Sequence, residues 1–80
     1  MDIDSRRIGV TGFKQVMRAL DAGQLIAVYL ADDVDAHMRR TVTEACGKAG
    51  VPVIGVPTMK ELGRACGIEV SAACAGILQG

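Results

Sequence analysis

Aromatic side chains are almost absent from this chain of 80 residues: Phe13 and Tyr29 are the only two, and there is no tryptophan. A core must therefore be built from aliphatic side chains, Met and Ala, and half of the residues are hydrophobic. No apolar run approaches the ~20 residues that a membrane-spanning helix needs. The first residues also lack the basic-then-apolar order of a signal peptide. We expect a single domain over residues 1–80, located in the cytoplasm and not bound to a membrane.

Cysteine and histidine are equally sparse. Cys46, Cys66 and Cys74 are odd in number and form no C-x-x-C motif, so neither a disulfide framework nor a zinc site is predicted. We expect small buried thiols in a reducing compartment. His37, the only histidine, has no cluster of cysteines or carboxylates near it in the sequence and is predicted to lie on the surface. No glycine-rich phosphate loop is present. We therefore predict no enzyme, no catalytic residue, no metal, no cofactor and no small-molecule substrate.

The chain has no excess of either charge, because nine Lys and Arg residues balance nine Asp and Glu residues. This balance counts mildly against a nucleic-acid partner, since many nucleic-acid-binding domains are basic. The charges are unevenly spread, however. The first quarter holds the cations Arg6, Arg7, Lys14 and Arg18. Four carboxylates follow without an intervening cation: Asp21, Asp32, Asp33 and Asp35. A neutral total can therefore hide a basic face.

Strand and helix patterns alternate along the chain. Apolar runs predict strands at 7–10, 25–31, 51–56 and 72–78. Helical patterns predict helices over 11–23, 34–49 and 59–65 or 59–66. The continuous run 25–31 predicts a strand covered on both faces. Pro52 predicts an edge position or a strand start, and the small residues of 72–78 favour a central strand. The alternation indicates an α/β fold, a three-layer α/β/α sandwich.

The helix at 11–23 has the most informative first turn. Thr11 is the predicted N-cap, and the backbone N–H groups of residues 12–14 would lack partners inside the helix. The predicted buried stripe consists of Phe13, Val16, Met17 and Leu20. Lys14, Gln15 and Arg18 fall on another face, where they either form a solvated surface or join the free N–H groups in binding phosphates and base edges.

Capping residues and stripes also organise the second half. Asp33 is the predicted N-cap of the helix 34–49, whereas Gly23 and Gly50 are predicted to end helices. The predicted inward stripe of that helix is Val34, Met38, Val42, Ala45 and Ala49. Its predicted polar stripe is His37, Arg40, Glu44 and Lys48. Gly63 and Gly67 are expected to serve packing and capping.

Three segments carry a family resemblance: residues 12–23 (GFKQVMRALDAG), 31–35 (ADDVD) and 56–70 (VPTMKELGRACGIEV). Together they resemble the kink-turn RNA-binding ribosomal protein family, of the L7Ae and L30e type. The most specific part is the Leu-Gly-x-Ala-Cys-Gly pattern at 62–67. The resemblance extends over residues 8–78, and the short bacterial ribosomal-protein-like members are the most similar.

The resemblance implies a mixed four-stranded sheet and a non-enzymatic, monomeric RNA-binding protein. Family members bind kink-turns, which are sharply bent RNA duplexes with a short bulge beside tandem sheared G·A pairs. A structured RNA, such as ribosomal RNA or a riboswitch, is thus the expected partner. A protein-interaction module that kept the fold and lost RNA binding is the alternative. A small enzyme, or the substrate-recognition part of one, is a weaker one.

Carried over by position, the resemblance implies an RNA-binding surface of ten residues. They are Gly12, Phe13, Lys14, Gln15, Arg18, Asp33, Val56, Pro57, Thr58 and Met59. Gly12 would allow close approach, Lys14 and Gln15 would meet guanine edges, and Arg18 would reach a base edge or a phosphate. Residues 56–59 would form an apolar lid over the bulge, although Val56 and Met59 also fit an ordinary core. Asp33 and Asp35 would flank the site and orient its cations.

Several positions depart from the family pattern. Lys14-Gln15 stands where archaeal and eukaryotic members carry Asn-Glu, and Phe13 replaces a usually small residue. Pro57 lacks the polar side chain that some relatives carry at its position.

Overall fold

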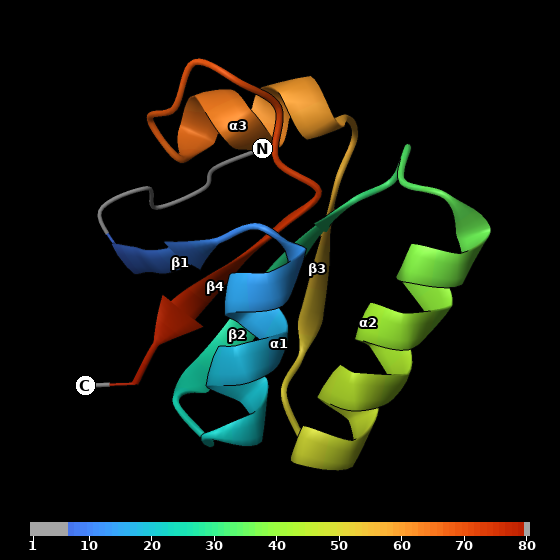
Figure 1. Cartoon of the computed structure of the whole chain (residues 1–80), viewed down its shortest axis with the longest axis vertical. Helices are drawn as coiled ribbons and strands as arrows, with labels where there is room; N and C mark the ends of the chain where they lie inside the picture. The colour runs from blue at the N-terminus through green and yellow to red at the C-terminus, as the bar shows by residue number, and fades with distance from the viewer. Residues whose placement is uncertain (1–6, 80) are drawn as a thin grey trace.

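A computed structural model describes residues 7–79 of the chain. The elements follow in the order β1 (Ile8–Thr11), α1 (Phe13–Asp21), β2 (Leu25–Ala31), α2 (Ala36–Ala49), β3 (Val53–Val56), α3 (Met59–Ala65) and β4 (Cys74–Leu78) (Figure 1). Strand and helix alternate as the hydrophobic pattern predicts. The bounds of β2 are those expected from its apolar run, and β3 and β4 are shorter than their runs by two residues each at the start.

The four strands form one mixed sheet in the order β1-β4-β2-β3. β2 and β3 are parallel, whereas β4 is antiparallel to both of its neighbours. β4 is therefore central and β3 lies at an edge, as the small residues of β4 and the position of Pro52 predict. Gly76 shows why small residues suit β4. A Cβ there would lie 2.7 Å from Leu25 and 3.0 Å from Val10, so glycine lets these side chains close over the strand.

The helices cover the sheet from separate positions. α1 and α2 lie side by side and contact each other, whereas α3 packs on β2, β3 and β4 at one end of the molecule (Figure 1). Residues 27–31 of β2 are all buried, so both faces of the sheet centre are covered. Ile26, at 41% exposure, is the exception to the prediction for this strand. The largest fully buried side chains are Leu62, Val16, Val28, Val42, Val56, Cys46 and Cys74.

Two predicted helix caps are wrong. Thr11 is part of β1, and Gly12 is the N-cap of α1 with a φ of 90°, which side chains rarely adopt. Asp35 rather than Asp33 caps α2, because its carboxylate accepts the N–H of Met38 at 2.7 Å. α2 consequently begins at Ala36, two residues after the predicted start. In both cases the N-cap is a residue one or two positions after the predicted one. The general preference for Thr or Asp at an N-cap does not show which of these residues takes the position.

The predicted stripes are partly confirmed. Val16 and Leu20 are buried on α1, but Phe13 and Met17 are only half-buried. On α2, Cys46 is buried in place of Ala49, which is exposed. The polar stripe is exposed throughout, at His37, Arg40, Glu44 and Lys48. Gly23 and Gly50 follow their helices with positive φ, as predicted.

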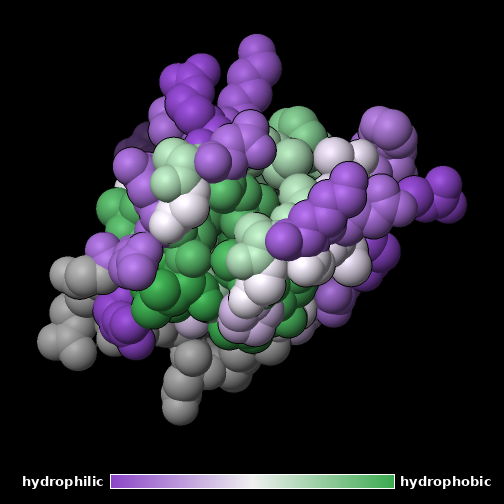
Figure 2. Space-filling view, turned by 90° about the horizontal axis from the view of Figure 1, so that it is seen from below, coloured by the Kyte–Doolittle hydropathy of each residue, from purple (hydrophilic) through white to green (hydrophobic). Residues whose placement is uncertain are grey.

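β3 is largely exposed, although its sequence is almost entirely apolar. Val53 and Ile54 are 36% and 38% exposed, and only Val56 is buried. An edge strand has one neighbour, so its apolar composition does not guarantee burial. Apolar surface also gathers at the end of the molecule where β2 begins and β4 ends, within a rim of polar side chains (Figure 2). Among residues 7–79, no helix is long and apolar enough to cross a membrane.

Candidate nucleic-acid interface

Three consecutive residues leading into β4 hold three distant parts of the chain together. The N–H of Ala72 donates to the carbonyl of Met59 at 3.0 Å, and the N–H of Ala31 donates to the carbonyl of Ala73 at 2.9 Å. The carbonyl of Cys74 then accepts the N–H of Gly12 at 2.8 Å. The start of α1, the end of β2 and the start of α3 therefore meet at one end of the sheet. We call residues 12–18, 32–35 and 57–59 the candidate surface.

The first turn of α1 supplies its polar part. The hydrogen bond from Gly12 to Cys74 corrects the prediction that the N–H of Gly12 is free. The N–H groups of Phe13 and Lys14 form no hydrogen bond within residues 7–79 and remain available. Apart from its chain neighbours, no heavy atom of residues 7–79 lies within 4 Å of where a Cβ of Gly12 would stand, so the described surface is open there. Lys14, Gln15 and Arg18 are exposed.

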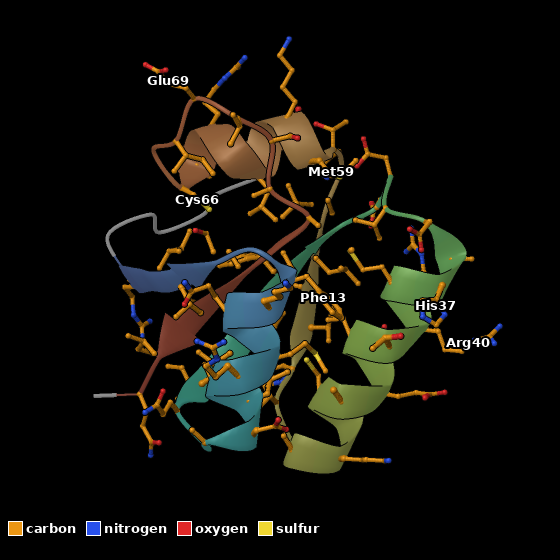
Figure 3. The ribbon with its side chains drawn as sticks, viewed as in Figure 1. Phe13, His37, Arg40, Met59, Cys66 and Glu69 are labelled. Carbon is orange, nitrogen blue, oxygen red and sulfur yellow. The ribbon has the colours of Figure 1, made fainter. Side chains whose placement is uncertain are left out.

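Phe13 has a mixed position. Its side chain is half-buried and packs against the hydrophobic core. It lies on the side of α1 that faces α2 (Figure 3). Only part of the ring can therefore contact a ligand, and the rest anchors the start of α1.

Acidic residues shape the loop between β2 and α2. Asp33 accepts the N–H of Met59 at 2.8 Å, 26 residues along the chain. Arg39 donates to the carbonyl of Asp32, and its guanidinium lies 3.9 Å from the Asp32 carboxylate. With Asp35 capping α2, these carboxylates are engaged within the protein. The family resemblance implied that Asp33 and Asp35 orient the cations Lys14 and Arg18, but these carboxylates bind backbone N–H groups instead.

The predicted apolar lid divides into a buried and an exposed part. Val56 is only 1% exposed, so its side chain is core and supports the loop from beneath. Its carbonyl accepts the N–H of Asp32 at 2.7 Å. Pro57 is exposed, whereas Thr58 and Met59 are half-buried. Thr58 caps α3 by accepting the N–H of Glu61 at 3.0 Å.

Two exposed apolar residues on the segment after α3 were not singled out in the sequence. Ile68 and Val70 follow α3 and are 37% and 70% exposed. The carbonyl of Val70 would lie 2.1 Å from a Cβ on Gly63, so this segment runs directly over α3. In the sequence, Ile68 and Val70 stand out as two large apolar residues in a short connection. That pattern alone does not show whether the connection is buried or exposed.

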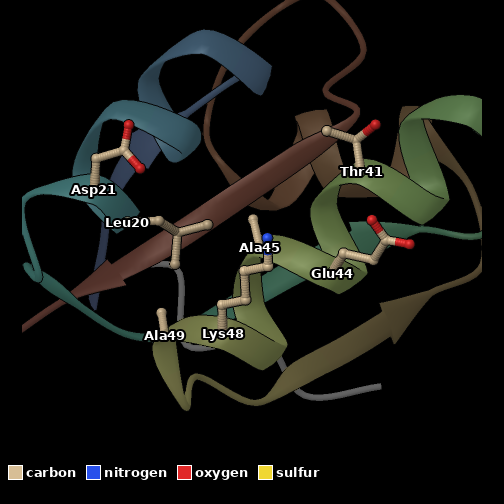
Figure 4. Close-up of a pocket in the computed structure, with 7 residues that line it drawn as sticks. All are labelled: Leu20, Asp21, Thr41, Glu44, Ala45, Lys48 and Ala49. Carbon is tan, nitrogen blue, oxygen red and sulfur yellow. The ribbon is translucent and has the colours of Figure 1, made fainter.

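Neither the cavities nor the thiols suggest acid–base or metal chemistry. A groove between α1 and α2 carries the carboxylates of Asp21 and Glu44 and the ammonium of Lys48 (Figure 4). These charges of both signs surround apolar side chains near the far end of α1. Residues 7–79 contain no cluster of His, Cys, Asp and Glu that could hold a metal ion. Burial raises the pKa of the Cys46 and Cys66 thiols, which leaves them protonated rather than nucleophilic.

The mixed four-stranded sheet and its three helices define a small α/β domain in which the start of α1 and the start of α3 meet at one end of the sheet. Residues 4–80 match the model of the ribosomal protein L7Ae/L30e/S12e/Gadd45 family, and the chain belongs to that family. It is 46% identical to the RNA-binding protein YbxF of Geobacillus stearothermophilus, over 88% of this chain and 85% of that protein. It is 42% identical to the RNA-binding protein TTE2299 of Caldanaerobacter subterraneus subsp. tengcongensis, over 82% and 80%.

A solved structure shares the fold. The 15.5kD RNA binding protein of Giardia lamblia superposes with a TM-score of 0.82 at 26% identity, over 94% of this chain and 62% of that one. The predicted resemblance and the predicted α/β fold with a mixed four-stranded sheet are therefore confirmed. The family and the names of its relatives also support a binding protein rather than an enzyme.

Proposed function

We propose that this protein binds structured RNA and that its target is a kink-turn, which it holds in the bent form. The single observation that carries the proposal is the junction at residues 72–74, which joins the start of α1, the end of β2 and the start of α3. A protein surface that is assembled before binding loses less conformational freedom when it holds a bent RNA. Family membership and the relatives named as RNA-binding proteins support the same conclusion.

The polar part of the candidate surface suits a widened groove. The N–H groups of Phe13 and Lys14 are donors at a helix start, where anionic groups are favoured. Lys14 and Arg18 add two exposed cations, and the Gln15 amide can both donate to and accept from base edges. We propose that α1 enters the groove by its first turns, with Gly12 leaving room for the backbone of the RNA.

The apolar part suits unstacked bases. Bulged nucleotides expose flat apolar faces that proteins cover with apolar side chains. Pro57, which is exposed, and Met59, which is half-buried, offer such a cover. Val56 and Thr58 contribute from behind, as support and as helix cap. We propose that the bulge rests on this lid while α1 contacts the adjacent G·A pairs.

A titration of wild-type protein against a standard kink-turn duplex tests the function. We expect saturable binding at low salt and at least tenfold weaker binding to a duplex in which the G·A pairs are replaced by Watson–Crick pairs. Because the surface offers the two cations Lys14 and Arg18, log K should fall with log salt with a shallow slope of about −2. Equal affinity for both duplexes would contradict kink-turn recognition. No binding to either duplex at low salt would favour the protein-interaction module, which the net charge of zero also allows.

Arg18→Ala tests whether the bound RNA extends along α1 as far as Arg18. We expect a loss of about 1–3 kcal/mol in binding free energy, as for a base-edge contact in DNA, because Arg18 is exposed one turn beyond Lys14. Arg40→Ala is the matched control, since this exposed arginine lies on α2 and points away from α1 (Figure 3). A gel-shift or fluorescence titration measures both. If the two variants bind equally well, Arg18 is outside the interface.

The natural target, ribosomal or riboswitch RNA, is part of this proposal, and the cytoplasmic location and monomeric state stay predictions.

A further inference from the structure

The peptide group of Met59 is held from two sides by segments far away in the sequence. Its N–H donates to the Asp33 carboxylate at 2.8 Å, and its carbonyl accepts from Ala72 at 3.0 Å. An N–H in the first turn of a helix has no partner inside that helix, so nothing local would replace Asp33. Thr58 is already engaged with Glu61 one turn on. Among residues 7–79, Asp33 therefore provides the one side-chain hydrogen bond that joins the 57–59 loop to the 32–35 loop.

The 32–35 loop is itself held by hydrogen bonds at both ends. At its start, the N–H of Asp32 donates to the Val56 carbonyl at 2.7 Å, and the Asp32 carbonyl accepts from the Arg39 guanidinium. Its last residue, Asp35, caps α2 at 2.7 Å. Asp33 lies between these two anchors. It bridges a loop that is rigid to a loop whose lid residue, Met59, is only half-buried.

We propose that Asp33 is a positioning residue that aligns the lid with the rest of the candidate surface and does not itself contact RNA. The part of this inference that is tested by RNA binding rests on the proposed function. It replaces the direct RNA contact implied by the family resemblance with a structural role for Asp33. A carboxylate near phosphates repels them, so its removal should strengthen binding if charge alone counted. A carboxylate that aligns the lid should instead be needed for tight binding.

Three variants separate these roles by titration with the kink-turn duplex. Asp33→Ala removes the acceptor, and we expect affinity to fall about tenfold even though a negative charge is lost. Asp33→Asn retains an acceptor oxygen, and we expect affinity equal to or above that of the wild type. Asp21→Ala, at the end of α1, removes an exposed carboxylate remote from the lid and controls for net charge.

A second measurement on the free protein needs no RNA. We expect exchange of the Met59 amide proton with deuterated water, followed by NMR, to be about tenfold faster in Asp33→Ala and near the wild-type rate in Asp33→Asn. A wild-type protein that binds no kink-turn overturns the proposed function, and the exchange rates alone then decide whether Asp33 orders the lid. Unchanged exchange and unchanged affinity in Asp33→Ala overturn the positioning role. Equal weakening by Ala and Asn also overturns it, because only a direct contact of the charge with RNA requires the carboxylate.

Discussion

Replacement of Gly63 by alanine is expected to lower the free energy of unfolding by about 3 kcal/mol. A Cβ at this position would lie 2.1 Å from the carbonyl oxygen of Val70 and 2.9 Å from the Cα of Ser71. Both are backbone atoms, so relief requires a shift of the whole segment rather than a rotamer change. In a domain of this size the loss corresponds to a fall of about 10–20 °C in Tm. Thermal unfolding followed by circular dichroism measures it.

Gly47→Ala is the matched control, because it makes the same change inside the longer helix. No atom lies within 4 Å of the Cβ that would be added at Gly47, and its φ is not positive. Alanine should therefore stabilise the protein by about 0.5–1 kcal/mol through helix propensity. Should Gly63→Ala prove as stable as Gly47→Ala, the close contact between α3 and the 68–71 segment would be refuted.

The same contact gives a physical reason for part of the family pattern. Gly63 is the second residue of the Leu-Gly-x-Ala-Cys-Gly motif, where Leu62 is fully buried. Without a side chain, Gly63 lets the backbone at Val70 pass over α3 and deliver Ala72 to the Met59 carbonyl. The prediction of a packing role is thus confirmed. Its importance for the candidate surface could not be predicted, since the segment it meets was expected only to connect two elements.

The parts of the fold that could be predicted from the sequence are those set by local signals. The continuous apolar run defined β2 to the residue. The helical pattern from residue 59 placed the start of α3 where it is observed, directly after Thr58, which caps it. Gly50 ended α2 because only a residue that tolerates positive φ can close a helix in this manner. In each case the determining residues are neighbours in the chain.

The parts that could not be predicted depend on partners far away in the sequence. Thr11 and Asp33 are both favourable N-caps, yet one pairs in β1 and the other bonds to Met59. The N–H of Gly12 was expected to be free because no helical residue can accept it, and the acceptor is instead Cys74 in β4. Val56 could have been either lid or core, and the pairing of β3 with β2 decides for the core.

For the candidate site, the sequence identified the right segments but not the tasks of their residues. Lys14, Gln15 and Arg18 are exposed as expected, because the polar face of an amphipathic helix turns toward solvent when its apolar face packs on the core. The acidic loop was expected to address these cations, but its carboxylates cap and bridge within the protein. A negative charge in the sequence does not reveal whether it meets a ligand or a backbone N–H.

Raising the pH from 9 to 11 is expected to remove about 2 kcal/mol of stability through Cys74. Burial, followed by the nearby Cys46 and Cys66 thiols, raises the pKa of Cys74 from 9.0 to about 11. Below pH 9 the thiol is neutral in both the folded and the unfolded protein, and this stability is fully present. Between 9 and 11 the unfolded chain loses a proton that the folded chain retains, so unfolding becomes more favourable by about 1 kcal/mol per pH unit. Urea unfolding at pH 8, 9, 10 and 11 measures the slope.

Cys74→Ala isolates this contribution. The variant should be less stable at pH 8, since a buried side chain is shortened, but its stability should decline more slowly between pH 9 and 11. An identical decline in both proteins would show that other groups cause the loss. The result also concerns the candidate surface, because the carbonyl of Cys74 holds the N–H of Gly12 at the start of α1. The strand whose thiol must stay neutral in the core is the same strand that fixes the start of α1.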